Sequence, residues 1–287
     1  LRIMQLLPRK GKTVDPETMD VCKFMVDKFQ SLAKERVEEE FIKLLMKAKR
    51  PSLGLKYLQE SGWDIHFPEL KKLQGCYQNP EHHPEGDVWD HTLLVVDMAA
   101  KLRDRIPEEW KLAFMFGALL HDVGKPSTTL DDGSASGHDM AGEEPARSFM
   151  NRITNNKDLI SKVVDIVIYH MRPGQLYSCK SKVNAWKRLH NKIRLDVIGL
   201  MSYCDSISRY YTSIDMDHEP SKFALDYFDQ FGPEEIKPVL MGRDLIERGH
   251  KPGKHFGIIL QRAYDYQIDT GETDKDVIYN NIRKEIQ

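Results

Sequence analysis

The 287-residue sequence lacks several features that would assign it to a class at once. Its 42 basic and 44 acidic side chains nearly cancel, which argues against binding of nucleic acid through bulk positive charge. No run approaches the roughly 18–20 apolar residues of a membrane span, and no secretion signal is recognisable at the start. Its four cysteines form no CxxC pair, so neither a zinc ribbon nor a disulfide framework is indicated. We therefore expect a soluble cytoplasmic protein without a membrane partner.

The sequence also lacks internal repeats and the strict apolar and polar alternation of exposed β-strands. Apolar residues recur at helical spacing instead, and Pro16 behind Asp15 is typical of the first turn of a helix. An all-α fold is predicted. The expected helices cover two amphipathic stretches within 17–49, then 51–58, 88–104, 108–121, 139–153, 157–171, 181–189 and 192–211.

Three successive segments are expected along the chain. A helical neck or body occupies residues 1–74, and its last residue begins a loop rich in Gly, Pro and Asn that leads into a helix near Val88. The helical bundle of residues 75–216 carries most of the histidines of interest. Residues 217–287 contain helix-length pieces separated by Gly and Pro, which predicts a small helical tail.

Histidines and aspartates lie at or near the ends of these helices or inside apolar stretches, where an unpaired ionisable group is costly. A metal ion would satisfy several of them at once. Imidazole and carboxylate ligands together suit Mg²⁺ or Mn²⁺ when carboxylates dominate, and Fe, Co, Ni or Zn when histidines dominate. The candidate ligands are His91, His121, Asp122, His138, His170 and Asp205.

Four of these residues, His91, His121, Asp122 and Asp205, are enough for one divalent ion with open positions for water and substrate. His138 and His170 would hold a second ion, with Asp122 as the bridge. Such an ion lowers the pKa of its water and polarises a phosphoryl oxygen, so phosphoester hydrolysis becomes feasible at neutral pH.

Lys125 follows in the segment "LLHDVGKP", one helical turn past His121, where it can face developing phosphoryl charge. Asp122 and Lys125 are therefore the predicted catalytic residues. Gly124 and Pro126 are interpreted as the end of the helix.

A purely structural interpretation competes at each position. A single histidine such as His170 is commonly a hydrogen-bonded core residue, and His138 can be a helix cap. The remaining histidines lie in loops or charged stretches and are expected to face solvent: His82, His83, His190, His218, His250 and His255.

The order of a histidine in "EGDVWDHTLLV", the pair in "ALLHDVGKP" and a late aspartate resembles the HD superfamily of metal-dependent phosphohydrolases. The resemblance implies that His91, His121, Asp122 and Asp205 are metal ligands. The "GHDMAGEEPA" and "PVLMGRDLIERGHKPGKHFG" segments narrow it to the neck, body, HD and tail regions of bacterial class II CCA-adding enzymes and poly(A) polymerases. Their nucleotidyltransferase head, with its Gly-Ser motif and paired aspartates, has no counterpart in this sequence, so we do not expect nucleotide addition by this chain alone.

In that family the helical regions bind tRNA through its backbone. Here residues 43–56 contain no acidic side chain, and residues 180–194 place six Lys or Arg around an aromatic residue, which indicates phosphate contact and base stacking. The alternative is a solvated helix face, which is the commoner role of isolated lysines. Where the family commonly has "ADARGR", this chain has "YCDSISRYY". The predicted substrate or RNA contacts are Arg172, Lys182, Trp186, Lys187, Arg188, Arg209 and Arg243.

Three functions remain open. The first is a metal-dependent phosphodiesterase or phosphatase acting on nucleotides or RNA 3′ ends, such as 2′,3′-cyclic phosphates, since the resemblance implies that activity together with 2′-nucleotidase activity. The second is the body and tail of a CCA-adding tRNA nucleotidyltransferase. The third is a non-catalytic RNA-binding module with a structural ion. The complete ligand set and Lys125 favour the first function, and tRNA is an expected partner. The sequence leaves open the identity and number of the ions and the oligomeric state.

Overall fold

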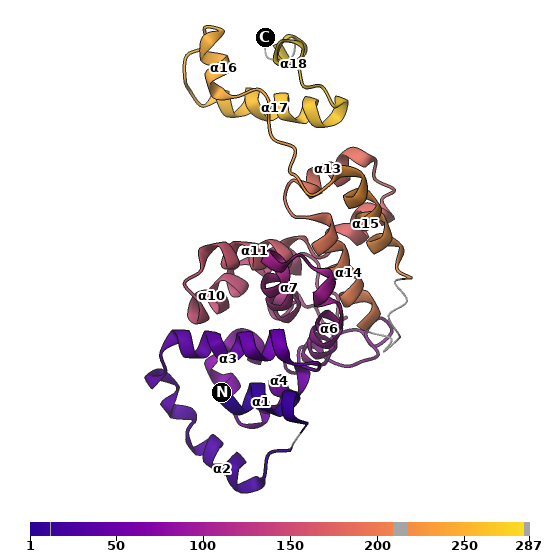
Figure 1. Ribbon diagram of the computed structural model, residues 1–287. Helices are drawn as coiled ribbons and strands as arrows, with labels where there is room; N and C mark the ends of the chain where they lie inside the picture. Colours follow the sequence, from indigo (N-terminus) through magenta and orange to yellow (C-terminus); the bar gives the residue numbers. More distant parts are fainter. Residues whose placement is uncertain (12, 209–216, 284–287) are drawn as a thin grey trace.

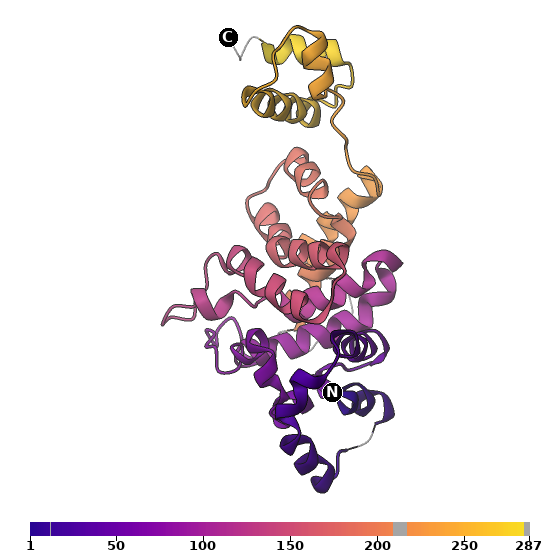
Figure 2. The same ribbon diagram turned by 90° about the vertical axis from the view of Figure 1, so that its left-hand side faces the viewer.

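The computed structural model describes residues 1–11, 13–208 and 217–283, and none of these residues belongs to a β-strand. The predicted all-α class is confirmed. Two views show an elongated molecule, with the amino-terminal helices at one end, the helices that begin at residue 88 in the middle and the carboxy-terminal helices at the other end (Figures 1 and 2). None of the described helices is long and apolar enough to cross a membrane.

The amino-terminal region is a helical layer whose apolar side chains join the main core. Asp15 caps the second helix as expected, because its side chain accepts a hydrogen bond from the backbone N–H of Thr18. The helices of this region are α1 (Arg2–Lys10), α2 (Pro16–Phe24), α3 (Lys34–Lys47), α4 (Ser52–Glu60) and α5 (Pro68–Lys71).

One expectation for this region is wrong. The periodicity of Val21, Phe24 and Met25 predicts a buried face, but these side chains are 56%, 86% and 45% exposed. The second predicted helix, with Val37, Phe41, Leu44 and Leu45 in the core, is correct as α3.

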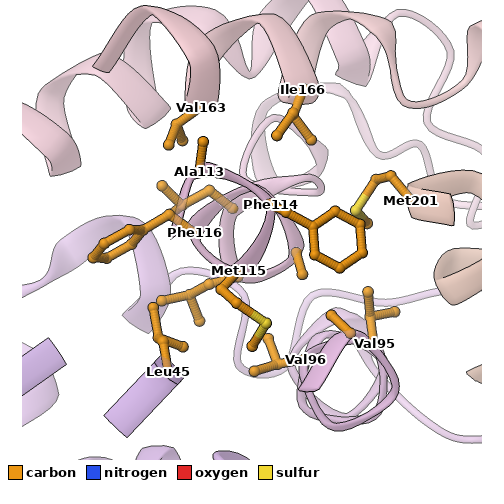
Figure 3. Packing of buried hydrophobic residues seen from close by; sticks show 14 of the residues in the cluster. Leu45, Val95, Val96, Ala113, Phe114, Met115, Phe116, Val163, Ile166 and Met201 are labelled. Carbon is orange, nitrogen blue, oxygen red and sulfur yellow. The ribbon is translucent and has the colours of Figure 1, made fainter. Parts of the chain in front are cut away.

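The middle of the molecule is built around α7 (Glu108–Leu120), whose residues 113–120 are all buried. Side chains of neighbouring helices surround Phe114, Met115 and Phe116 (Figure 3), so this part of the helix is apolar on every side rather than amphipathic. Its neighbours are α3, α6 (Val88–Leu102), α11 (Lys157–Tyr169) and α14 (Leu195–Ser208).

Shorter helices complete this region. The predicted helix 139–153 is divided at Gly142, where a Cβ atom would meet the Val167 side chain at 2.7 Å. The apolar pattern predicts no separate helix at α12 and gives no bounds for α15. The helices are α8 (Lys125–Thr128), α9 (His138–Ala141), α10 (Glu143–Ile153), α12 (Arg172–Ser178), α13 (Val183–His190) and α15 (Glu219–Phe231).

Two hydrophobic clusters divide the chain. The first extends from Met4 to Ala224 and so includes the helix α15, which packs on α14 and α12. The second is small and belongs to α16 (Gly242–Glu247), α17 (His255–Thr270) and α18 (Lys275–Arg283). The predicted domain boundaries at 74/75 and 216/217 stay a prediction, since the helices on either side of both share the first cluster.

Candidate metal centre

The six candidate ligands meet at one place between α6, α7, α9, α11 and α14. His91 lies in the first turn of α6, and Asp205 lies in the last turn of α14. The other four ligands lie at the beginning or just after the end of a helix. His121 and Asp122 follow α7, His138 starts α9 and His170 follows α11, and all six side chains are buried.

Asp122 is the centre of this cluster. Its Oδ1 atom lies 3.2 Å from His138 Nε2 and 4.0 Å from His170 Nε2. Its Oδ2 atom lies 3.2 Å from His121 Nε2 and 3.8 Å from His91 Nε2. His91 Nε2 is in turn 3.0 Å from Asp205 Oδ1. Each Asp122 oxygen thus faces one half of the ligand set, which is the arrangement that a bridging carboxylate needs.

The backbone fixes how three of the imidazoles point. His121, His138 and His170 each place Nδ1 at 2.7–3.0 Å from the carbonyl oxygen three residues earlier, those of Ala118, Ala135 and Val167. A carbonyl accepts only, so Nδ1 carries the proton and Nε2 keeps its lone pair. Metal-binding histidines are commonly held in this way.

Unpaired buried atoms show that these residues fit a cation. Within the described part of the chain, His121 Nε2 and Asp122 Oδ2 have no hydrogen-bond partner. Lys125 Nζ lies 2.8 Å from Asp122 Oδ2, but the contact is an ion pair without the alignment of a hydrogen bond. Buried polar atoms are almost always paired, so convergent lone pairs of two carboxylates and four imidazoles match a divalent ion.

The charges of the cluster shift its pKa values in opposite directions. Burial acts to raise the pKa of Asp122, but the electrostatic influence of His121 and Lys125 and the contact with His138 outweigh it, so the pKa lies well below its ordinary value. Burial and the neighbouring His121 lower the pKa of His170 to about 4. Asp122 is thus an anion and His170 a neutral imidazole at neutral pH, as metal ligands must be.

Lys125 is held in place beside the aspartate. It is only 8% exposed, and its ammonium donates a hydrogen bond to Gln78 Oε1 at 2.7 Å. It is the first residue of α8, so the predicted end of the helix at Gly124 and Pro126 needs correction. The helix α7 ends at Leu120, and Pro126 lies in the first turn of the next helix.

Gly124 has a different role from the expected helix stop. Its φ of −81° is ordinary right-handed backbone. A Cβ atom there would meet the His138 carbonyl oxygen at 2.0 Å and the Gly142 nitrogen at 2.6 Å. Glycine therefore allows α9, which carries His138, to pack directly against the chain after Asp122.

A cavity of about 450 Å³ lies against the cluster. Asp122, Lys125, His138 and Asp205 form one part of its wall. The loops that contain Asn79, His82, His83, Asp132 and Ser134 form the other part. Its volume is in the range of small-molecule sites, so a ligand here would reach the carboxylates and the lysine together.

Glu85 is a residue of this centre that the sequence pattern does not predict. This buried carboxylate accepts hydrogen bonds from His91 Nδ1 at 2.7 Å and His83 Nδ1 at 2.9 Å. Loop residues follow no periodicity, so only the clustering of His and Glu in "EHHPEG" could have drawn attention to it. His83 and His190 were expected to face solvent, but His83 is largely buried against Glu85, and His190 is 2% exposed.

Most of the predicted RNA contacts do not share one surface. Trp186 is 1% exposed and packs against Tyr227, so its predicted base stacking is wrong: the apolar ring completes the core between α13 and α15. Arg188 pairs with Asp269 and Asp265 of α17. Arg172 and Arg188 line one cavity with Lys192.

The other predicted RNA contacts are separate from that cavity's lining. Lys182 is exposed just before α13, Lys187 is half-buried on α13, and Arg243 is exposed on α16. Arg209 lies outside the described residues.

Two families match this chain. Residues 88–210 match the HD domain, and residues 12–73 match the family described as the probable RNA and SrmB-binding site of polymerase A. Among curated proteins, the multifunctional CCA protein of Neisseria meningitidis serogroup C is 32% identical over 186 residues, which cover 63% of this chain and 43% of that protein. The corresponding protein of Laribacter hongkongensis is 31% identical over 221 residues, which cover 73% of this chain and 52% of that protein. The chain thus spans about half the length of these relatives.

Among solved structures, a Thermotoga maritima CCA-adding enzyme complexed with tRNA is 14% identical, with a TM-score of 0.48, over 100% of this chain and 60% of that one. The sequence matches alone establish the relationship. The chain therefore contains an HD domain at residues 88–210 and resembles the bacterial multifunctional CCA proteins over 63–73% of its own length.

Proposed function

We propose that this chain is a divalent-metal-dependent phosphohydrolase that acts on nucleotides or RNA 3′ ends, 2′,3′-cyclic phosphates included. One observation carries the proposal. Four imidazole Nε2 atoms and two carboxylates converge beside a cavity, with three of the opposite ring nitrogens already bonded to backbone carbonyls. A structural histidine cluster has no need for this shared orientation.

The two halves of the cluster define which residues would bind each ion. His91, His121 and Asp205 form one group of ligand atoms, and Asp122, His138 and His170 form the other. When bound, divalent ions would polarise a phosphoryl oxygen and make water a competent nucleophile near neutral pH. Asp122, with one oxygen toward each group, would hold the two positions together.

The chain's own residues supply orientation and charge. Lys125 is buried at the cavity wall, and Gln78 fixes its ammonium, so a positive charge is already in position for the phosphoryl oxygens of a substrate. The loops at His82 and Ser134 face it across the cavity. A cavity of about 450 Å³ admits one nucleotide or one RNA end rather than a folded nucleic acid.

A phosphoester panel tests this function. The purified chain should hydrolyse 2′,3′-cyclic nucleotides, 2′-nucleotides or p-nitrophenyl phosphate in the presence of Mn²⁺, Ni²⁺, Co²⁺, Zn²⁺ or Mg²⁺. Asp122→Ala should abolish turnover, whereas Asp20→Ala, which changes an exposed carboxylate on α2, should leave it unchanged. The proposal fails when wild-type protein turns over no phosphoester with any of these ions.

RNA binding is the second part of the proposal. The match of residues 12–73 to an RNA-binding family supports it, as does the cavity lined by Arg172, Arg188 and Lys192. Arg172→Ala should weaken the tRNA gel shift and reduce its salt slope by about one, because each neutralised phosphate releases counterions. Lys157→Ala, at an exposed lysine on α11, is the control.

A second candidate function is the body and tail of a CCA-adding nucleotidyltransferase. The similarity to multifunctional CCA proteins favours it. The coding frame upstream of Leu1 and the neighbouring frames decide the matter, because a head domain with a Gly-Ser motif and paired aspartates must be encoded there. Finding none would exclude this candidate.

A further inference from the structure

We propose that Glu85 is a positioning residue of the metal centre, which keeps the His91 proton on Nδ1 and so leaves Nε2 available to the ion. The inference rests on the proposed function, since it assigns a role toward that same site. Glu85 is not one of the ligands in either half of the cluster around Asp122. Its effect is exerted through His91.

The contacts of Glu85 are those of a buried anchor. Its side chain is 0% exposed, and its Oε1 atom lies 2.7 Å from His91 Nδ1 and 2.9 Å from His83 Nδ1. Burial of a carboxylate is costly unless donors compensate for lost water. The two ring N–H groups compensate Oε1, with His83 on the cavity side, whereas the buried Oε2 atom has no hydrogen-bond partner among the described residues.

His91 needs such a partner because of its place in the fold. His121 and His170 follow the ends of α7 and α11, where the last carbonyls of a helix are unsatisfied and can accept from Nδ1. His91 lies in the first turn of α6 instead. The carbonyl three residues earlier, at Val88, accepts a hydrogen bond from the Thr92 hydroxyl at 2.8 Å. The acceptor for His91 Nδ1 must come from another segment, and the loop before α6 provides it.

A second carboxylate competes for the same proton. Asp205 Oδ1 lies 3.0 Å from His91 Nε2, so without Glu85 a neutral His91 would place its proton on Nε2 and donate it to Asp205. That tautomer blocks the nitrogen that faces the site and occupies a second ligand oxygen. Glu85 prevents both by holding the proton on the opposite nitrogen.

Metal affinity tests the first consequence. Loss of an outer hydrogen-bond partner of a metal-binding histidine typically weakens metal binding about 10- to 100-fold. We expect Glu85→Ala to raise the Mn²⁺ dissociation constant, measured by electron paramagnetic resonance, by about that factor. Glu85→Gln should weaken Mn²⁺ binding less, because the amide oxygen of glutamine can still accept a hydrogen bond from His91 Nδ1. Glu81→Gln, at an exposed glutamate in the same loop, should have wild-type affinity.

The ring tautomer tests the mechanism without metal. In two-bond ¹H–¹⁵N spectra of the metal-free protein at alkaline pH, His91 should carry its proton on Nδ1 in the wild type and on Nε2 in Glu85→Ala. A residue that only supports the loop would change the melting temperature and leave the tautomer unchanged. An unchanged tautomer, or wild-type Mn²⁺ affinity in Glu85→Ala, overturns the inference.

A third variant separates positioning from direct coordination. His83→Ala should retain the wild-type number of bound Mn²⁺ ions, and loss of one ion would show that His83, Glu85 and His91 form a metal site of their own, which also overturns the inference. If wild-type protein binds no Mn²⁺ at all, the proposed function fails, and the tautomer measurement still decides the role of Glu85.

Discussion

His138 Nε2 lies 3.2 Å from His170 Nε2, although the Nδ1 atom of each ring is bonded to a backbone carbonyl. Two lone pairs would face one another unless a proton or a cation lies between them. Burial and the nearby His121 lower the pKa of His170 to about 4, whereas the hydrogen bond with Asp122 outweighs burial and raises the pKa of His138, so a proton between the rings would belong to His138. A divalent ion removes the conflict, and Asp122 supplies the negative charge that accompanies it.

Metal binding should therefore stabilise the folded chain. An ion present at a hundred times its dissociation constant raises the free energy of unfolding by about 2.7 kcal/mol. Thermal melts with Mn²⁺ should show this gain, and EDTA should remove it. Asp122→Ala should show no response to Mn²⁺, while Asp20→Ala responds like wild type. A wild-type melt that no divalent ion shifts would contradict this prediction.

Removal of the buried lysine should affect turnover more than metal binding. Lys125→Met keeps the aliphatic stem and deletes the charge beside the cavity. We expect kcat to fall about 100-fold, equivalent to about 2.7 kcal/mol of transition-state stabilisation. Metal content measured by mass spectrometry should stay at the wild-type value. Lys157→Met is the exposed control. Loss of metal together with activity would instead assign Lys125 a structural role toward Asp122.

A methyl group at Gly124 should disturb the centre through the backbone. In Gly124→Ala the Cβ atom would lie 2.0 Å from the His138 carbonyl oxygen, so α9 must move away from Asp122. We expect a loss of about 1–3 kcal/mol in unfolding free energy and weaker Mn²⁺ binding. Gly174→Ala is the matched control, because a Cβ atom there meets nothing within 4 Å. Equal behaviour of the two variants would argue against the close packing of α9.

Acid should weaken the contact between α5 and α10. Burial acts to raise the pKa of Glu69, but hydrogen bonds from Arg152 and Ser148 outweigh it and the pKa is lowered from 4.5. The stabilisation by ionised Glu69 is thus fully present above pH 4.5 and decreases as the pH falls through the lowered folded value.

The variant Glu69→Gln tests this dependence. We expect the substitution to lower the free energy of unfolding by about 1.5–3 kcal/mol at pH 7, since it removes a charged partner of a largely buried hydrogen-bonded group. Urea denaturation of both proteins should show the difference shrinking between pH 5 and pH 3. A difference that is independent of pH would rule out the ion pair as its source.

Local pattern was sufficient for much of the helical fold. The expected helix 108–121 is α7, and 157–171 is α11, each to within two residues at either end. Apolar periodicity failed where tertiary packing decides burial. Val21 and Phe24 have helical spacing, but no neighbouring helix covers them among the described residues. Trp186 lies among basic residues in the sequence, but it is buried by Tyr227 and Phe223, which belong to α15.

The sequence by itself determined the chemistry of the candidate centre, because the types of His91, His121, Asp122 and Asp205 and their places at helix ends follow from pattern alone. Only the tertiary structure decided which atoms meet. It turns three of the four Nε2 atoms inward through backbone carbonyls, gives one Asp122 oxygen to each half of the cluster, and brings Glu85 to His91 from a loop without periodicity. Contacts between segments about a hundred residues apart, such as His91 and Asp205, depend on how helices pack, and no local pattern contains that information.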